Sequence, residues 1–289
     1  MAKLIFGCGY LGSRVADLWC KRGETVVAAT RNSAKAEMLK QRGITPLIGD
    51  ITEPSTLERL PEADTVLFAV GFDRSSSHTI EKVYADGLRN VLGALPSAPH
   101  RIIYISTTGV YGHAAGDWID EFTPCHPERE GGRASLAAEQ VLAQHAYCDR
   151  GVILRLAGIY GPGRIPRRAD LLAGRSIDAP ALGYLNLIHV DDAAHIVDTA
   201  AKWALPPRTY NVSDGHPVER AEYYRELARL LGAPPPTFSE PPSDSPAARR
   251  AQASKRVSNA LLVSELEITF AHPSYREGLA AIVAAENME

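Results

Sequence analysis

Three glycines near the N-terminus have the spacing of a phosphate-binding loop. Gly7, Gly9 and Gly12 form the pattern GxGxxG between a short apolar run and an amphipathic stretch. In a strand–turn–helix unit the first glycine permits a tight turn, the second lets a pyrophosphate approach, and the third lets the helix lie close to the sheet. The N–H groups at the start of the helix attract phosphate. We therefore expect this loop, which includes Tyr10 and Leu11, to bind a dinucleotide.

An arginine stands where a site for NAD usually carries an acid. That acid lies about 20 residues beyond the glycines, at the end of the second strand, and binds the ribose 2′-hydroxyl. This chain has Arg31 after the apolar run VVAAT. Because a guanidinium pairs with a 2′-phosphate that a carboxylate would repel, we predict that NADP is favoured over NAD. The alternative is a solvated surface arginine that follows a strand.

Two further strand ends are expected at the same cleft. Ligands of parallel α/β sheets bind outside the carboxyl ends of the strands. The sequence Gly-Asp-Ile places Asp50 and Ile51 at the end of the third strand, near the adenine. The sequence Ala-Val-Gly ends the fourth strand, where the backbone of Ala69, Val70 and Gly71 would approach the cofactor ribose. Each segment is equally well explained as an ordinary turn.

Short β-branched runs alternate with amphipathic stretches through the first half of the chain. The predicted strands are Lys3–Phe6, Thr25–Thr30, Thr45–Ile48, Thr65–Ala69, Arg101–Ser106 and Val152–Leu156. Strands with helices between them form a parallel sheet that is covered on both faces. The pattern predicts an α/β fold with a Rossmann-type doubly wound parallel sheet. We place this dinucleotide-binding domain at residues 1–160.

The remainder of the chain, residues 161–289, is predicted to be a smaller, mostly helical substrate lobe whose segments interleave with the sheet. Helices are expected around Val218–Leu231, Ser258–Leu266 and Pro273–Ala285. Residues 233–246 are rich in proline, which fixes φ and removes a backbone donor, so this segment is predicted to be a loop.

Composition excludes several classes of partner. Thirty-one Lys and Arg against 34 Asp and Glu leave a net charge of -3, so there is no broad cationic surface for nucleic acid or membrane. No uncharged apolar run reaches the roughly 18 residues of a membrane span. The four cysteines are far apart, which indicates a reducing, cytoplasmic location.

No metal site is expected, because the histidines lack the spacing of metal ligands. The sequence HVDD contains a histidine and two carboxylates in front of an apolar-periodic helix. Asp191 and Asp192 are predicted to cap that helix. His189 is predicted to fix the turn by a hydrogen bond.

Four blocks of the sequence resemble the extended short-chain dehydrogenase/reductases, the group of NAD(P)-dependent nucleotide-sugar epimerases and dehydratases. They are Arg101–Gly112, Arg155–Arg164, Leu187–Ala194 and Tyr210–Gly215, in the family's order. The resemblance spans nearly the entire chain and is closest to an atypical, epimerase-like bacterial branch. It implies an NAD(P)-binding oxidoreductase or isomerase that acts on a nucleotide sugar or a similar small molecule, and a homodimer through helices that flank the sheet.

The family's catalytic residues are only partly present. The family uses a Ser or Thr after the fifth strand and a YxxxK pair on the next helix, whose lysine lowers the pKa of the tyrosine. Thr107 matches the hydroxyl position. Counting back from Glu139 places Gly131 at the tyrosine and Ser135 at the lysine, so the pair is missing. Tyr111 is an alternative acid–base group, although in the family this tyrosine usually packs against or borders the substrate.

The turn GIYGPGR resembles the family's substrate-lining YGP motif. The resemblance implies that Tyr160 borders a ligand and that Arg164 pairs with its diphosphate. A Gly-Pro turn that only reverses the chain is the alternative.

Two functions stay open: an enzyme with an unusual proton donor, and a catalytically inactive dinucleotide sensor or scaffold. The positions of Gly131 and Ser135 discriminate between them. An open gap there would admit a substrate or water, whereas a filled gap would make catalysis implausible.

Overall fold

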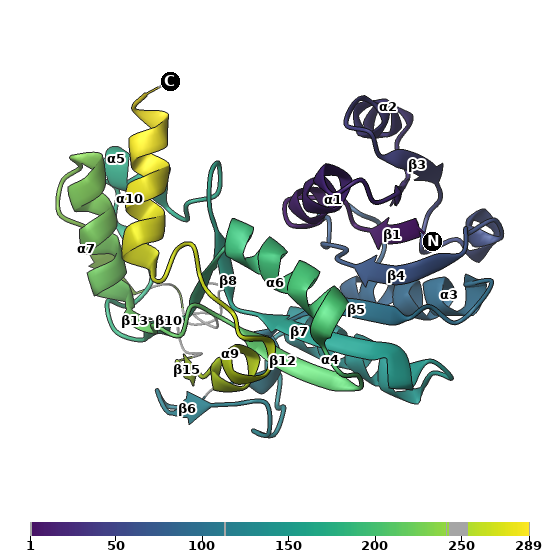
Figure 1. Cartoon of the computed structure of the whole chain (residues 1–289). Coiled ribbons are helices and arrows are strands. Elements are labelled where there is room, and N and C mark those ends of the chain that lie inside the picture. The colour runs from purple at the N-terminus through teal and green to yellow at the C-terminus, as the bar shows by residue number, and fades with distance from the viewer. Residues whose placement is uncertain (1, 113, 241, 243–253, 289) are drawn as a thin grey trace.

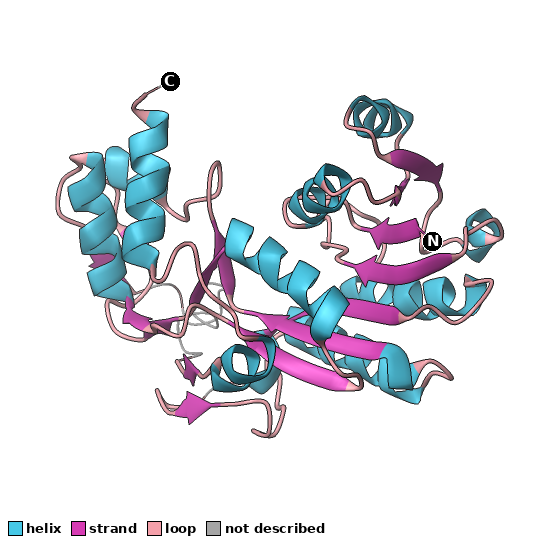
Figure 2. Ribbon diagram, in the orientation of Figure 1, coloured by secondary structure: helices cyan, strands magenta, loops and turns pink. Residues whose placement is uncertain are grey.

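The computed structural model describes residues 2–112, 114–240, 242 and 254–288. At its centre lies a seven-stranded sheet with the order β12-β7-β5-β4-β1-β2-β3 (Figures 1 and 2). The strands are β1 (Ala2–Phe6), β2 (Val26–Thr30), β3 (Thr45–Ile48), β4 (Ala63–Phe68), β5 (Arg101–Thr107), β7 (Gly151–Leu156) and β12 (Arg208–Val212). All neighbouring strands are parallel. Because the winding reverses between β1 and β4, this is the predicted Rossmann-type doubly wound fold.

All six predicted strands lie in this sheet, with ends that differ by no more than two residues. The seventh strand, β12, comes from the C-terminal half of the chain and pairs with β7 along its whole length. The C-terminal half of the chain therefore contributes a strand to the central sheet. The division into two units at residue 160 stays a prediction.

Helices cover both faces of the sheet because successive strand residues point to opposite sides. In β1, Ile5 packs into one core and Leu4 into the other. The helices on the Ile5 side are α1 (Gly12–Lys21), α2 (Ser33–Gln41), α6 (Val190–Trp203) and α9 (Ala260–Leu266). Those on the Leu4 side are α3 (Gly87–Ala94) and α4 (Glu130–Gln144). Burial on both faces explains the near-continuous apolar runs of the strands.

A separate, smaller core packs three helices against one another beside the sheet (Figure 1). These are α5 (Arg168–Leu172), α7 (Arg220–Leu231) and α10 (Tyr275–Glu286). Four short strand pairs frame the lobe and its approach: β6 (Trp118–Ile119) with β15 (Arg256–Val257), β8 (Gly158–Tyr160) with β11 (Leu187–His189), β9 (Ile177–Asp178) with β14 (Phe238–Ser239), and β10 (Tyr184–Leu185) with β13 (Val218–Glu219). The predicted helices correspond to α7, α9 and α10, but α9 packs beside β12 and α6 instead of joining this smaller core.

The proline-rich segment 233–246 differs in part from the predicted loop. Its residues Phe238 and Ser239 form β14, which pairs in parallel with β9. Residues 241 and 243–246 of the segment lie outside the described residues. In the described part of the chain, none of the helices has the length and apolar character to cross a membrane.

Candidate cofactor site and active site

A cavity of about 1270 Å³ opens at the carboxyl ends of the central strands. Its wall combines the segments that follow β1, β2, β3, β4, β5 and β7 with the first turns of α4. The predicted cofactor residues in its lining are Gly7, Gly9, Tyr10, Leu11, Arg31, Asp50, Ile51, Ala69, Val70 and Gly71. The remaining one, Gly12, lies behind the loop. The fold thus brings together residues that the sequence spreads over more than sixty positions.

The three glycines of the loop differ in the space around them. Gly7 has φ +92°, and a Cβ there would lie 2.4 Å from the backbone of Ala69. A Cβ on Gly12 would lie 2.3 Å from the carbonyl oxygen of Gly7. A Cβ on Gly9 would meet no atom within 4 Å. Two glycines are therefore required by packing, and the middle one leaves open space in front of α1, whose N-cap residue, Leu11, has no side-chain cap.

Tyr10 links the glycine loop to the turn after β8. Its hydroxyl donates to the carbonyl oxygen of Pro162 at 3.0 Å. The guanidinium carbons of Arg14 and Arg164 lie 4.4 and 5.3 Å from its ring centroid, within the range of cation–π attraction. Arg14 is also paired with Asp191 at 2.8 Å, whereas Arg164 lines the cavity and has no ion-pair partner in the described part of the chain. Arg164 therefore offers its charge to the cavity beside the glycine loop.

One end of the cavity is cationic. Arg31, Lys35 and Arg74 all line it and are exposed, and the Arg31 side chain is 56% exposed. Arg31 lies 3.7 Å from a carboxylate oxygen of Asp50. Burial alone would raise the pKa of Asp50, but hydrogen bonds from Thr52 and the charge of Arg31 outweigh it and lower the pKa. The carboxylate is therefore ionised and offsets part of the cationic charge. Sequence reasoning missed Lys35 and Arg74, because no motif spacing marks them.

The other end of the cavity contains Thr107 and the start of α4. Thr107 lines the cavity and accepts a hydrogen bond from the Gly109 amide at 3.1 Å, and within the described residues its own hydroxyl proton has no acceptor. From α4, Gly131 and Ser135 line the wall, and neither is a Tyr or a Lys. A Cβ on Gly131 would meet only Ile80, at an ordinary 3.7 Å. There is thus room for a small side chain at residue 131, whereas Ser135 is only 4% exposed.

Tyr111 lies below the cavity in a buried polar network, and the prediction that it serves as an acid–base group is wrong. Its side chain is 3% exposed. The hydroxyl donates to Asn211 at 2.8 Å and accepts from Arg155 at 2.7 Å. Burial outweighs the nearby Arg155 and raises the pKa of Tyr111 to about 12. Arg155 in turn forms a buried ion pair with Glu139, with an N–O distance of 2.6 Å. Both hydrogen-bonding roles of the phenol are therefore occupied by the fold.

Tyr160 is fully buried, and the prediction that it borders a ligand is wrong. Its residue is 0% exposed and lies in the smaller core. Pairing of β8 with β11 turns the ring inward, and its hydroxyl donates to the carbonyl oxygen of Ser274 at 3.3 Å. A Cβ on Gly278 of α10 would lie 2.1 Å from that hydroxyl. Tyr160 therefore holds α10 in place, while Arg164, in the same turn, faces the cavity.

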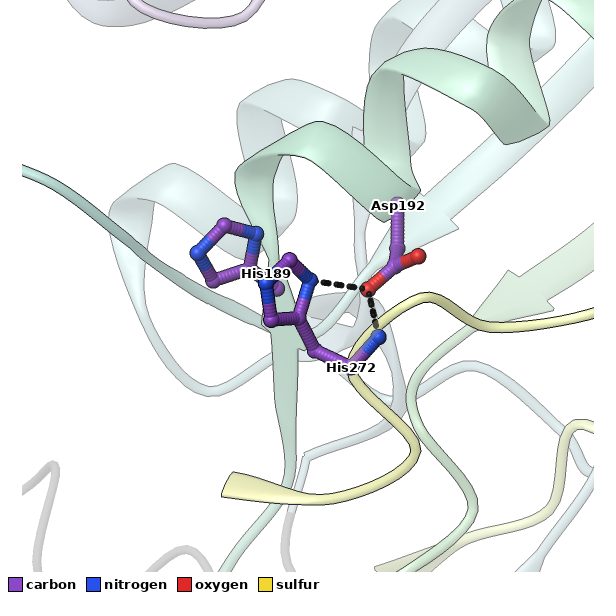
Figure 3. Close-up of side chains that lie close together, drawn as sticks. All are labelled: His189, Asp192 and His272. Atoms are coloured by element: carbon purple, nitrogen blue, oxygen red, sulfur yellow. Dashed lines mark hydrogen bonds and ion pairs between the residues drawn. The ribbon is translucent and has the colours of Figure 1, made fainter. Parts of the chain in front are cut away.

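Asp192 connects the start of α6 to the segment before α10 (Figure 3). It is 4% exposed and accepts three hydrogen bonds: from the Ala271 amide at 2.7 Å, and from the amide and Nδ1 of His272 at 3.0 Å each. The rings of His189 and His272 stack with centroids 3.7 Å apart. We call His189, Asp192, Ala271 and His272 the Asp192 joint. The prediction that Asp192 caps α6 is wrong, because its carboxylate binds a different segment.

The start of α6 is capped by a histidine. His189 Nδ1 accepts from the Asp191 amide at 3.3 Å, as predicted for a residue that fixes the turn. Asp191 itself pairs with Arg14, so the prediction that it is a cap is also wrong. His189, Asp192 and His272 are metal-ligand types within 4.8 Å of one another. Both Nδ1 atoms are already engaged, that of His189 by the Asp191 amide and that of His272 by the Asp192 carboxylate.

Comparison with known proteins gives one family. The model of the NAD dependent epimerase/dehydratase family matches residues 4–213. Protein YeeZ of Escherichia coli (strain K12) is 31% identical over 242 residues, which cover 81% of this chain and 85% of YeeZ. The structure of a putative NAD-dependent epimerase/dehydratase from Methylobacillus flagellatus is 31% identical, with a TM-score of 0.79 over 99% of this chain and 98% of that one.

A more distant structure shares the fold alone. The Bordetella bronchiseptica enzyme WbmG, in complex with NAD and UDP, has a TM-score of 0.83 at 22% identity. The alignment covers 100% of this chain and 95% of the WbmG chain.

Proposed function

Because the chain belongs to the NAD dependent epimerase/dehydratase family of extended short-chain dehydrogenase/reductases, we propose that it binds NADP(H) in the cavity and uses it to oxidise or reduce a small molecule beside Thr107. The observation that carries the proposal is that one cavity joins the glycine loop, the cationic end and Thr107. A dinucleotide laid across the strand ends would place its phosphates at the loop and its nicotinamide near Thr107.

The preference for NADP rests on the cationic end of the cavity. Arg31, Lys35 and Arg74 supply three cations there, opposed by two carboxylates: Asp50, at 3.7 Å from Arg31, and Asp73, which also lines the cavity and interacts with Arg31. A 2′-phosphate would be attracted by this charge, and the Arg31 guanidinium has the planar fork that binds phosphate oxygens. A bare 2′-hydroxyl would gain little from the same residues.

The chain's own residues would position and polarise the substrate. A nicotinamide dinucleotide, when bound there, would supply or accept the hydride. Thr107 would donate a hydrogen bond to a substrate oxygen and hold the reacting carbon against the cofactor. Because α4 lacks the family's Tyr and Lys, we expect turnover to be about 10²- to 10⁴-fold slower than a positioned acid–base group allows. Nucleotide sugars are the first substrates to test, since WbmG binds UDP in the same fold.

A dinucleotide sensor is the second candidate function. It is favoured by the identity of Gly131 and Ser135, which line the cavity without any group that could exchange a proton as the family's pair does. A sensor would bind NADP(H) without turnover. In either case, the homodimer through the helices that flank the sheet stays a prediction, for which sedimentation at several protein concentrations is the test.

The proposal is tested by calorimetric titration of the cofactor-stripped protein with NADP and with NAD. We expect micromolar binding of NADP and at least tenfold weaker binding of NAD, a difference of about 1.4 kcal/mol. Arg31→Asp should remove the preference. Arg59→Asp, at an exposed arginine outside the cavity, should keep it. Heat from neither dinucleotide would overturn the proposal.

Turnover is then measured as oxidation of NADPH, or reduction of NADP, with a panel of nucleotide sugars. Turnover that falls in Thr107→Val, with unchanged NADPH affinity, would support the enzyme. Tight binding without turnover of any substrate in the panel would favour the sensor.

A further inference from the structure

Tyr84 contributes a phenol to the same cavity from the side opposite the glycine loop. It lies in the π-helical turn η2 (Lys82–Asp86), which leads directly into α3. The side chain is partly buried and lines the cavity. Its hydroxyl accepts a hydrogen bond from the Phe72 amide at 3.2 Å. Within the described residues the phenolic proton has no acceptor, so a hydrogen-bond donor at the cavity wall is left for a ligand.

The phenol lies at the end of the cavity that contains Thr107. The turn η2 packs against α4, and Ile80, one turn before Tyr84, is the neighbour that a Cβ on Gly131 would meet. Tyr104, whose hydroxyl is 3.5 Å from the Ser135 carbonyl oxygen, lies within electrostatic reach of Tyr84. Tyr84 is thus placed beside the segment of α4 where the family's pair is missing.

Its hydrogen-bond partner belongs to the loop that follows β4. Phe72 comes directly after the segment Ala69–Gly71, whose backbone is expected to approach the cofactor ribose. Tyr84 therefore does two things at once: it anchors this loop through the Phe72 amide, and it presents a proton next to it. Burial raises the pKa of Tyr84, so the phenol keeps its proton at neutral pH and is a donor there.

We propose that Tyr84 is a cofactor-binding residue, whose hydroxyl donates a hydrogen bond to the ribose next to the nicotinamide and so positions the reactive half of the dinucleotide. The proposal rests on the proposed function, because it needs a dinucleotide in the cavity. Ribose hydroxyls both accept and donate, and a phenol anchored to the backbone offers its proton in one fixed direction. Binding of a 2′-phosphate at the cationic end of the cavity would not depend on this hydrogen bond.

The test compares two ligands on one variant. Tyr84→Phe removes the hydroxyl and keeps the ring. Calorimetry with NADPH and with adenosine 2′,5′-bisphosphate, which lacks the nicotinamide riboside, separates the two halves of the site. We expect the Kd for NADPH to rise about three- to tenfold, as the loss of one hydrogen bond implies, and the Kd for the bisphosphate to change less than twofold.

Tyr104→Phe is the matched control, because it removes the hydroxyl of a neighbouring buried tyrosine that does not line the cavity. It should change neither Kd. Equal weakening of both ligands by Tyr84→Phe would mean that the hydroxyl acts only by holding the loop, and would overturn the proposal, as would unchanged affinity for NADPH. If the unaltered protein binds neither ligand, the proposed function itself fails and this inference falls with it.

Discussion

The glycine loop and the Asp192 joint use polar groups in opposite ways. Around Gly9 a side chain would meet no atom within 4 Å, and Arg31 is more than half exposed. At the joint, Asp192 is buried and accepts three hydrogen bonds from a segment about eighty residues away. Gly9 belongs to the GxGxxG pattern, and His189 and Asp192 belong to the block Leu187–Ala194 that resembles the family. The difference teaches that a motif residue is available to a ligand only where the fold leaves space around it or its polar groups unpaired.

The largest expected effect on ligand binding is at the glycine loop. Gly9→Asp would place a carboxylate in the space expected for the pyrophosphate, so NADPH affinity should fall at least 100-fold, about 2.7 kcal/mol. The melting temperature should hardly change, because no atom lies within 4 Å of the new Cβ. Calorimetry and thermal melting are the measurements. Gly93→Asp, at an equally open glycine on α3, is the control and should bind normally. Retained affinity in folded Gly9→Asp would remove the loop from the site.

A substitution in the Asp192 joint should lower the stability of the fold and leave NADPH affinity nearly unchanged. Asp192→Ala leaves the two backbone amides of residues 271 and 272 without their acceptor, so we expect a loss of about 3 kcal/mol in the free energy of unfolding. Asp191→Ala, at the exposed neighbour that pairs with Arg14, should cost under about 1 kcal/mol. Denaturant titration measures both. NADPH affinity of folded Asp192→Ala should stay within twofold, and a large loss would show that the two regions are coupled.

The stacked histidines of the joint should make the protein less stable in acid. Burial, and next the neighbouring His272, lower the pKa of His189 to about 4, whereas an unfolded histidine has a pKa near 6.5. Between these values only the unfolded chain takes up the proton. Stability should therefore be complete above pH 6.5 and fall as the pH drops toward 4, by at most about 1.4 kcal/mol per pH unit.

Unfolding free energies measured from pH 7 to pH 4 test this. His189→Asn keeps a side-chain acceptor at the N-cap of α6 and removes the titrating ring. Its stability should fall less steeply over the same interval. An equal slope in both proteins would assign the acid sensitivity to other groups.

The fold could be predicted from the sequence because its signals are local. An apolar run bounded by turns identifies a strand wherever its neighbours lie, and β3 was predicted with its observed ends. Gly7 and Gly12 could be assigned because backbone geometry alone requires glycine there. The parallel, doubly wound character of the sheet followed from the alternation of strands and helices.

The contacts of single side chains could not be predicted, because distant segments decide them. Tyr111 bonds to Asn211, 100 residues away, and Tyr160 to Ser274, 114 residues away. Neither partner is visible in the local pattern, so both tyrosines were assigned from family position. Arg74 and Tyr84 face the cavity without any motif, and only the structure identifies them.

The smallest expected effect is that of Arg164, which lies beside the glycine loop. Arg164 comes from the turn after β8 and lies 5.3 Å from the ring of Tyr10 in the glycine loop. If its charge acts on the cofactor pyrophosphate, Arg164→Gln should weaken NADPH about threefold, as an exposed charge pair implies. Arg225→Gln, at an exposed arginine of α7 outside the cavity, should have no effect. Unchanged NADPH affinity with weaker binding of a nucleotide sugar would instead assign Arg164 to the substrate diphosphate, and the open region would then extend from the cofactor into the second lobe.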